Sequence, residues 1–364
     1  MATVEKYETK SGATLYRVRY RTPDHRSTQK RGFTTKRDAE QFAASVEVAK
    51  MRGEYVAPSI GKTTIGELGP EWLQRQRGHM KPSGFRSYES AWRVHVKPRW
   101  ASRRISTIRY SEVQAWVTEL SGQLSASMVG TVYSVLARVM DDAVRDRMLT
   151  SNPARGVKLP KRPARHNVYL TAAQLQALAD EAAHYRSLVL LLGVGGLRWG
   201  EAAALRVRDV DFLRRRVALH RNAVMVGGQV FVGSLKSGKS RTVALPAFVA
   251  DALAQTAQGK GRDDLLWPSR SGGYLGPPVT YKSWLSGAVD RCMKADPTFP
   301  RVTAHDLRHT AASLAISAGA NPKVVQRMLG HASAAMTLDV YADLFDSDLD
   351  SVAESVAKMW PRLA

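Results

Sequence analysis

The sequence predicts a multidomain protein that is mainly α-helical with small β-sheets, an α+β fold. Its 364 residues suggest two or three domains, and 44% apolar residues are enough to build their cores. The spacing of the apolar residues changes along the chain, from alternation near the N-terminus to helical spacing and then to a mixture. We therefore expect a sheet-and-helix domain over residues 1–62, a helical domain over 63–158 and a mixed domain over 159–364.

The first domain is predicted to hold three strands and one helix. The stretches TVEKYET, TLYRVRYR and STQKRGF alternate in the manner of strands, and turn residues separate them at 10–12 and 22–24. A helix follows, with Thr34 or Thr35 as its N-cap and Gly53 at its end. So few elements form only a marginal core, which indicates a small accessory domain.

Three arginines mark the second of these strands. Because side chains alternate along a strand, Arg17, Arg19 and Arg21 should share one face of the sheet. Such a face suits a phosphate backbone or the guanine edges of a DNA major groove, although an ordinary solvated face is the alternative. We interpret these arginines as DNA-binding residues.

The second domain follows a linker over 56–64 and is predicted to contain four helices. IGELGPEWLQRQRG, SGFRSYESAWRVHVKPRW, YSEVQAWVTELSG and SASMVGTVYSVLARVMDDAVRDRML each place apolar residues at helical spacing. Pro82, Pro98 and Gly122 punctuate these stretches. A second, basic linker, NPARGVKLPKRPARHN, leads into the third domain.

The third domain mixes helices with short strands. Thr171 should cap a helix, and YRSLVLLLGVGGLRWGEAAAL predicts a buried helix, a glycine-rich bend and the start of another helix. Strand stretches follow at RRVALHRN and GGQVFVGSL, and we expect the second to form a hairpin with RTVALP across KSGKS. Residues 303–361 are again helical, with Gly330 ending one helix and Ser333 capping the next, which bears Tyr341.

An apolar stripe near the C-terminus predicts a terminal helix that must bury it. The stripe comprises Leu349, Val352, Val356, Met359 and Trp360. On the pattern alone, this helix could dock on its own domain or on a neighbouring protomer.

The net charge indicates the kind of partner. The 54 Lys and Arg residues exceed the 32 Asp and Glu residues by 22, an excess that favours a polyanion. A solubilising surface or a membrane-surface protein would also be basic, but arginines spread over the whole length favour nucleic acid.

No apolar run is long enough to span a membrane, and no secretory signal is apparent. Cys292 alone cannot form an internal disulfide or a thiolate metal site. We expect a cytoplasmic protein.

The stretch AHDLRHTAAS, residues 304–313, could hold a metal or a phosphate. Thr303 should cap this helix, with Asp306 as its capping-box partner. The two histidines are spaced as in an HExxH zinc site, but Asp306 replaces the glutamate and Arg308 would repel the cation. We therefore expect no metal. The guanidinium of Arg308 can bind two phosphate oxygens, and His305 can donate a further hydrogen bond. The alternative is a capped helix whose polar face is exposed to solvent and has no ligand.

An ordered series of motifs gives the chain a family resemblance. GLRWGE contains Arg198, HDLRH contains His305 and Arg308, MLGHAS contains His331, and TLDVYADL contains Tyr341. With a lysine in SLKSGKSRTVALP and the segment LTSNPARGV, this set resembles the tyrosine recombinase family, in particular phage integrases of the lambda type. The resemblance covers about residues 64–350, and the residues before it resemble the arm-binding domain of these integrases less closely. One departure is Ala202, where the family often has leucine, a change in packing and not in chemistry.

The resemblance implies a site-specific DNA recombinase that integrates and excises a phage genome at attachment sites. Tyr341 would attack a phosphodiester, form a 3′-phosphotyrosine and release a 5′-hydroxyl, and the hydroxyl of a partner strand would reverse the step. Since the number of bonds is unchanged, no ATP or other cofactor is needed. Arg198 and Arg308 would stabilise the charge of the transition state, with His305 and His331 as hydrogen-bond donors.

The proton transfers need two further groups. A phenol with a pKa of about 10 is a poor nucleophile at neutral pH, and we expect His305 to be the base. Lys236 is the expected acid for the leaving 5′-oxygen, with Lys239 as the alternative because sequence does not fix hairpin register. Glu201 should orient an active-site partner, and His309 is interpreted as structural, packing or bonding behind the site.

The resemblance also implies partners and a location. The protein would bind double-stranded DNA, with the first domain on arm-type sites and the two larger domains clamped around core-type sites. It would act as a homotetramer in the synaptic complex, with a host DNA-bending protein and an excision factor, in the bacterial host cytoplasm on nucleoid DNA. Four subunits on two duplexes favour docking of the terminal helix on a neighbouring protomer.

A chromosome-dimer resolvase is the rival enzyme, but such proteins usually lack an arm domain. A DNA-binding regulator with an inactive site is the rival from another class, and the complete motif set argues against it.

Overall fold

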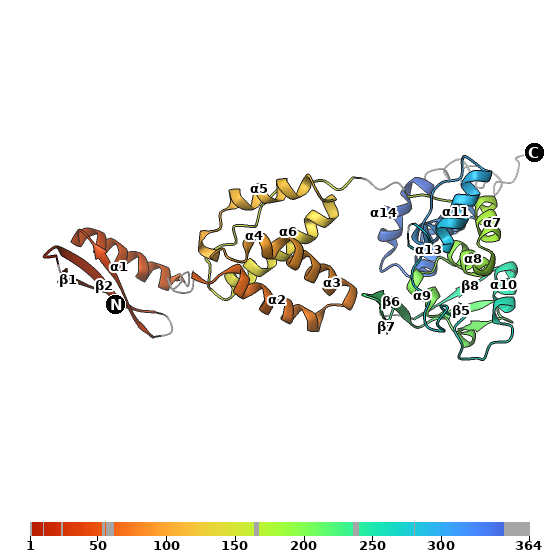
Figure 1. Cartoon of the computed structure of the whole chain (residues 1–364), viewed down its shortest axis with the longest axis horizontal. Helices are drawn as coiled ribbons and strands as arrows, with labels where there is room; N and C mark the ends of the chain where they lie inside the picture. The colour runs from red at the N-terminus through yellow and green to blue at the C-terminus, as the bar shows by residue number, and fades with distance from the viewer. Residues whose placement is uncertain are drawn as a thin grey trace, which may run out of the picture. The chain divides into compact units, whose positions relative to one another are not determined.

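The computed structural model describes residues 2–9, 11–22, 25–52, 55, 62–163, 167–235, 240–279 and 281–345. The chain divides into two compact units, residues 1–164 and 165–364, and Figure 1 labels most of their elements. Within the described part of the chain, no helix combines the length and the apolar character that crossing a membrane requires.

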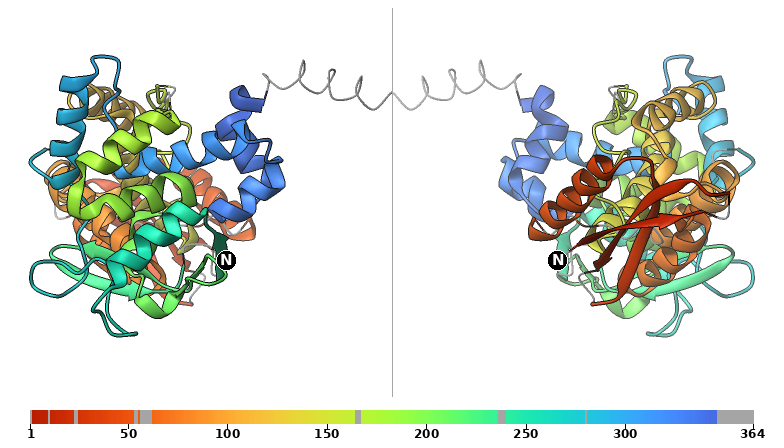
Figure 2. Two further views of the ribbon diagram at one scale, coloured as in Figure 1. Left: turned by 90° about the vertical axis from the view of Figure 1, so that its right-hand side faces the viewer. Right: turned by 90° about the vertical axis from the view of Figure 1, so that its left-hand side faces the viewer.

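The first unit begins with an antiparallel sheet and one helix that lies along it (Figures 1 and 2). The strands, in their order in the sheet, are β1 (Thr3–Glu8), β2 (Thr14–Arg21) and β3 (Ser27–Phe33). Helix α1 (Lys36–Met51) begins after Thr35, whose hydroxyl accepts a hydrogen bond from the backbone N–H of Asp38. The three strands, the helix and its N-cap are therefore confirmed, while the predicted end at Gly53 lies outside the described residues.

The alternation of β2 separates a core face from a basic face. The core of this segment contains Val18, Tyr20, Ala39 and Val46. Arg17, Arg19 and Arg21 occupy the alternate positions of the strand, and Arg19 and Arg21 are exposed. The predicted arginine face is thus present, because the neighbouring positions pack against α1.

A helical segment follows from residue 65. Its helices are α2 (Ile65–His79), α3 (Pro82–Ala91), α4 (Lys97–Trp100), α5 (Tyr110–Ser121) and α6 (Ala126–Arg145). Their apolar faces form one core, in which Trp72, Trp100 and Leu136 are fully buried. The four predicted helical stretches are therefore confirmed.

The stretch from α3 to α4 is helical throughout but changes its winding. Residues Trp92–Val96 form a π-helical turn, which the N–H of Lys97 closes by donating to Trp92 O. Pro98 lies in the first turn of α4 directly after it, where a missing N–H is tolerated, so the helix runs past this proline. Gly69 of α2 faces the Trp92 ring, and a Cβ there would lie 1.9 Å from a ring carbon. This close approach requires glycine.

The second unit is mainly helical and holds two small sheets (Figure 1). Its helices are α7 (Ala172–Glu181), α8 (Arg186–Gly195), α9 (Trp199–Ala203), α10 (Ala247–Ala257), α11 (Trp284–Ala295), α12 (Ala304–Ser317), α13 (Pro322–Leu329) and α14 (Ala334–Phe345). Its strands are β4 (Val210–Asp211), β5 (Arg216–Leu219), β6 (Asn222–Val226), β7 (Gln229–Gly233) and β8 (Arg241–Ala244). The apolar helix α8 packs against α7, α10 and α12, so it forms the centre of this core.

The strand pairing of the second unit differs from the prediction. β6 and β7 form their own hairpin, with Val226 opposite Gln229, and RTVALP supplies β8, which pairs with β5. The predicted hairpin of GGQVFVGSL with RTVALP is therefore wrong. Gly227 and Gly228 adopt φ values of 63° and 82° and form the two-residue turn that such values favour, whereas the prediction placed them within a strand.

The predicted helix ends around the sequence motifs are confirmed. Thr171 caps α7, and the Asp306 carboxylate accepts the backbone N–H of Thr303 at the start of α12. Gly330 ends α13 with a φ of 67°, and Ser333 Oγ accepts the N–H of Met336 at the start of α14. The terminal helix predicted from Leu349 to Trp360 lies outside the described residues.

Candidate active site

A glycine bend and the ends of several helices bring the motif residues of the second unit together. Gly196, with a φ of 67°, ends α8 and turns the chain so that Arg198 precedes α9. Helix α12 carries Arg308, His331 follows the end of α13, and α14 carries Tyr341. Because α12 packs against α8, α13 and α14, these side chains meet along α12.

Arg308 is the buried cation of this site. It is 3% exposed, and its guanidinium donates hydrogen bonds to Gly196 O at 2.6 Å and to Leu329 O at 2.7 Å. Burial and the nearby charges of Arg198 and Arg241 lower the pKa of Arg308 to about 9, which leaves it cationic at neutral pH. Its charge therefore acts where little water screens it.

Glu201 links two further arginines. It is 1% exposed, and its carboxylate accepts hydrogen bonds from Arg198 at 3.0 Å and from both terminal nitrogens of Arg241, at 3.0 and 2.7 Å. Burial alone would raise the pKa of Glu201, but the hydrogen bonds and charges of Arg241 and Arg198 outweigh burial, so the pKa is lowered. The ionised carboxylate therefore holds both guanidinium groups in place.

The same arginines cover the C-terminal end of α13. The last carbonyl groups of a helix have no partner within it. Here Arg241 Nε donates to Met328 O at 3.1 Å, Arg308 donates to Leu329 O, and Arg198 donates to Gly330 O at 3.4 Å. Positive charge also complements this end of the helix dipole. The segment that presents His331 is thereby held against the arginines.

His331 lies beside the arginines and the tyrosine. Its Nδ1 is 2.9 Å from the hydroxyl oxygen of the buried Thr337, and its ring is parallel to that of Tyr341 with centroids 6.5 Å apart. Burial, followed by the charges of Arg308 and Arg198, lowers the pKa of His331 to about 4. The imidazole is therefore neutral near pH 7 and carries one N–H.

Tyr341 is buried at a break in α14. It is 1% exposed, and its φ of −129° and ψ of 18° are not helical. Burial raises the pKa of its phenol to about 12, against the lowering effect of Arg308. The Oη atom lies 2.8 Å from Nδ1 of His309. Since the phenol is protonated near neutral pH, a nucleophilic role needs a group that accepts its proton.

The outcome for the predicted catalytic residues is mixed. The structure brings together Arg198, Arg308, His331 and Tyr341. His305 is exposed on α12, one turn before His309, and the two ring centroids are 4.8 Å apart. Lys236 and its alternative Lys239 lie outside the described residues.

Two residues of the cluster go beyond the sequence prediction. Arg241 lies on β8, and nothing in RTVALP distinguishes a buried cation from a solvated strand arginine. His309 was interpreted as a structural residue, and its ring contacts the Tyr341 hydroxyl. The spacing could have indicated that His309 lies near the site, because His305 and His309 are four residues apart and share a helix face. Among the residues that the structure describes, no group of three His, Cys, Asp or Glu side chains could hold a metal ion.

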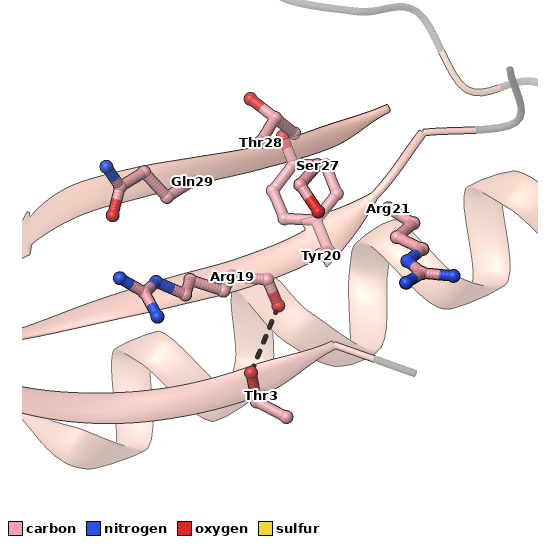
Figure 3. A pocket seen from close by; sticks show the side chains of 7 residues that line it. All are labelled: Thr3, Arg19, Tyr20, Arg21, Ser27, Thr28 and Gln29. Carbon is pink, nitrogen blue, oxygen red and sulfur yellow. Dashed lines mark hydrogen bonds between the residues drawn. The ribbon is translucent and has the colours of Figure 1, made fainter. Parts of the chain in front are cut away.

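The basic face of the N-terminal sheet is hollowed (Figure 3). A cavity of about 550 Å³ is lined by Thr3, Arg19, Tyr20, Arg21, Ser27, Thr28 and Gln29. Arg17 and Arg19 pair with Glu5 of β1, at 2.7 and 3.3 Å, which restrains their guanidinium groups. Arg19 lies opposite Gln29 of β3, so donors of two strands stand side by side in this hollow.

Comparisons with known proteins give relatives of this chain and solved structures with a similar fold. The phage integrase family matches residues 168–348. The integrase of Mycobacterium phage FRAT1 is 30% identical over 322 residues, which cover 83% of this chain and 92% of that protein. The integrase of transposon Tn1549, solved in complex with a circular intermediate DNA, has a similar structure, with a TM-score of 0.69 and 21% identity over 80% of this chain and 99% of the other. A lambda integrase dimer bound to a COC′ core site gives a TM-score of 0.59 and 17% identity, over 92% and 93% of the two chains.

These likenesses differ in what they establish. The solved structures share the fold, which the lambda integrase matches over 92% of this chain and the Tn1549 integrase over 80%. The mycobacteriophage relative shares the sequence over most of both chains. The chain therefore belongs to the phage integrase family and is a site-specific recombinase.

Proposed function

We propose that this recombinase cuts and rejoins DNA through a 3′-phosphotyrosine intermediate, and that it integrates and excises a phage genome at attachment sites. Tyr341 is the nucleophile. The observation that carries this proposal is the meeting of one tyrosine with two arginines and a histidine from segments far apart in sequence. A buried cluster with three cations around one carboxylate has excess positive charge, which suits a phosphate.

The roles of the other residues follow from their positions. Arg198 and Arg308 stabilise the charge that develops on the non-bridging oxygens, and their contacts keep them in place before DNA arrives. The Thr337 hydroxyl can donate to Nδ1 of His331, and in that tautomer the Nε2–H group is left to donate to the phosphate. His305, exposed on the same helix as Arg308, donates a further hydrogen bond. Lys236 is the proposed acid for the leaving oxygen, with Lys239 as the alternative.

The tyrosine must be uncovered for the reaction. Its side chain is 1% exposed, so a phosphodiester reaches Oη only after the groups that cover the phenol move aside. DNA binding would then couple to the exposure of the nucleophile.

The domains divide the binding of DNA between them. Residues 1–62 bind arm-type sites through Arg17, Arg19 and Arg21, while 63–158 and 159–364 bind core-type sites. The net charge of +22 and the hollow basic face of the sheet support this assignment. Lambda integrase, which has the same fold, was solved as a tetramer bound to a Holliday junction, and we propose a homotetramer here also. A host DNA-bending protein and an excision factor complete the proposed partners.

A suicide substrate tests the chemistry. The full chain is incubated with DNA duplexes carrying its attachment core, nicked close to the scissile phosphate so that the released fragment diffuses away. Wild-type protein should accumulate as a covalent complex on denaturing gels, and peptide mapping should place the DNA on Tyr341. Covalent DNA on another residue, or cleavage without a covalent product, would contradict the proposal.

The role of the N-terminal sheet is tested by paired substitutions. Arg21→Ala removes an exposed cation from the basic face, and Lys36→Ala removes an exposed cation from α1 as its control. If Arg21 contacts a phosphate, its variant should weaken arm-site binding and reduce the slope of log Kd against log salt by about 1. Equal effects of the two variants would remove the sheet from the binding surface.

A further inference from the structure

His309 contacts the reacting atom of the nucleophile. It lies on α12 one turn after His305 and directly after Arg308. Its Nδ1 is 2.8 Å from Tyr341 Oη, and the two rings meet at 62° with centroids 5.7 Å apart. The phenol oxygen is thus within hydrogen-bond distance of a ring nitrogen.

The chemistry of the two groups sets the direction of this hydrogen bond. A buried phenol is protonated near neutral pH, and burial raises the pKa of Tyr341 to about 12. Its O–H therefore needs an acceptor. A neutral imidazole offers one unprotonated nitrogen, and Nδ1 is the atom within reach. In the neutral tautomer that carries its proton on Nε2, Nδ1 accepts the phenolic hydrogen.

The other two histidines of the site are placed for different tasks. His331 stacks parallel to the Tyr341 ring, and its Nδ1 engages Thr337. His305 is exposed, and its ring meets the edge of His309. The ring contacts thus run from His305 to His309 to Tyr341, and His309 is next to the phenol.

We propose that His309 is a further catalytic residue, the base that takes the phenolic proton of Tyr341 as Oη attacks phosphorus. This inference rests on the proposed function. The Oη–H bond breaks and its proton passes to Nδ1. The Oη–P bond forms while the bond from phosphorus to the 5′-oxygen breaks, and the leaving oxygen takes its proton from Lys236. The rejoining step runs in reverse and returns the proton from Nδ1 to Oη. His305 is then available to donate to the phosphate.

Two substitutions of His309 distinguish a role as a base from a role as a hydrogen-bonding partner only. In His309→Asn the side-chain amide occupies the place of Nδ1 and can still accept the phenol hydrogen bond, but it cannot take a proton. His309→Ala removes both functions and leaves room for free imidazole. His184→Asn is the matched control, since His184 is an exposed histidine of the same unit that contacts Tyr185.

Single-turnover cleavage of the nicked core substrate is measured with full-length proteins at several pH values. We expect His309→Asn and His309→Ala each to slow covalent complex formation by about 100-fold or more near pH 7, while His184→Asn matches wild type. The rate of the slow variants should rise with pH more steeply than that of wild type, because hydroxide must take the proton. Added imidazole should accelerate His309→Ala and not His309→Asn.

The possible results are distinguishable. A His309→Asn protein that cleaves at the wild-type rate would show that the contact only positions the phenol, and would overturn the proposal. The proposal would also be overturned if both His309 variants cleaved slowly with the pH profile of wild type and imidazole did not accelerate His309→Ala. That pattern would indicate structural damage and not the loss of a base. If wild-type protein itself formed no phosphotyrosine, the proposed function would fail and this inference with it.

Discussion

The carboxylate of Glu201 should contribute strongly to the stability of the second unit. Glu201→Gln keeps the size of the side chain but removes a negative charge that lies between Arg198 and Arg241 at 2.7 to 3.0 Å. Glu201 is 1% exposed, so water cannot replace it. The substitution leaves the neighbouring guanidinium groups without a counter-ion.

The magnitude follows from this burial. Removing one partner of a buried ion pair costs about 3–5 kcal/mol, and glutamine retains one acceptor oxygen, so we expect about 3 kcal/mol. In a unit of this size each kcal/mol lowers Tm by about 2–4 °C, which gives a decrease of about 6–12 °C. The matched control is Glu181→Gln, which breaks a solvent-exposed pair with Arg291 at 2.5 Å. It should cost less than about 1 kcal/mol.

Calorimetry of the full chain, with the transition of the second unit followed separately, measures both variants. The pH dependence gives a second check. Because the pKa of Glu201 is lowered in the folded protein, its stabilisation is present above the unfolded value of about 4.3 and is lost as the pH falls through the folded pKa. The difference in the free energy of unfolding between wild type and Glu201→Gln should have its full size at pH 7 and should decrease below about pH 4. Equal Tm losses for Glu201→Gln and Glu181→Gln would refute the reasoning.

Further predictions concern the residues around the same cluster. Tyr341→Phe should retain core-site affinity in mobility-shift assays and lose covalent complex formation completely, because only the phenol oxygen is removed. Gly330→Ala should destabilise the unit more than Gly319→Ala does in thermal denaturation: both glycines have positive φ, but a Cβ at Gly330 would lie 3.0 Å from the Arg241 guanidinium whereas the space at Gly319 is open. The lowered pKa of His331, about 4, implies that unfolding takes up a proton below the unfolded value of about 6.5, so stability should fall as the pH drops from about 6.5 toward 4, and His331→Gln should flatten that part of the curve. Cleavage should continue in excess EDTA without nucleotide, and loss of cleavage on chelation would contradict a reaction supported by arginines.

The sequence by itself determined the elements whose signals are local. The strand alternation around Arg17, Arg19 and Arg21 depends only on period two, and the N-caps Thr35 and Thr171 depend only on side chains that reach their own helix. The left-handed end of α13 was equally local, because Gly330 adopts a φ of 67°. The ordered motifs resemble those of tyrosine recombinases, and this resemblance predicts roles for Arg198, Arg308, His331 and Tyr341. The strand alternation, the N-caps and the helix end are set by residues within a few positions of one another.

Only the tertiary structure decided what depends on distant partners. The pairing of β8 with β5 replaced the expected hairpin, because strand pairing is selected by the whole sheet and by the turn at Gly227 and Gly228. Arg241 joined the site from that strand, since a buried Glu201 compensates its charge. The sequence predicts a structural role for His309, and the packing of α14 against α12 brings the Tyr341 hydroxyl to its Nδ1. Side-chain proximity across 32 residues or more is set by packing of helices, and no local pattern carries that information.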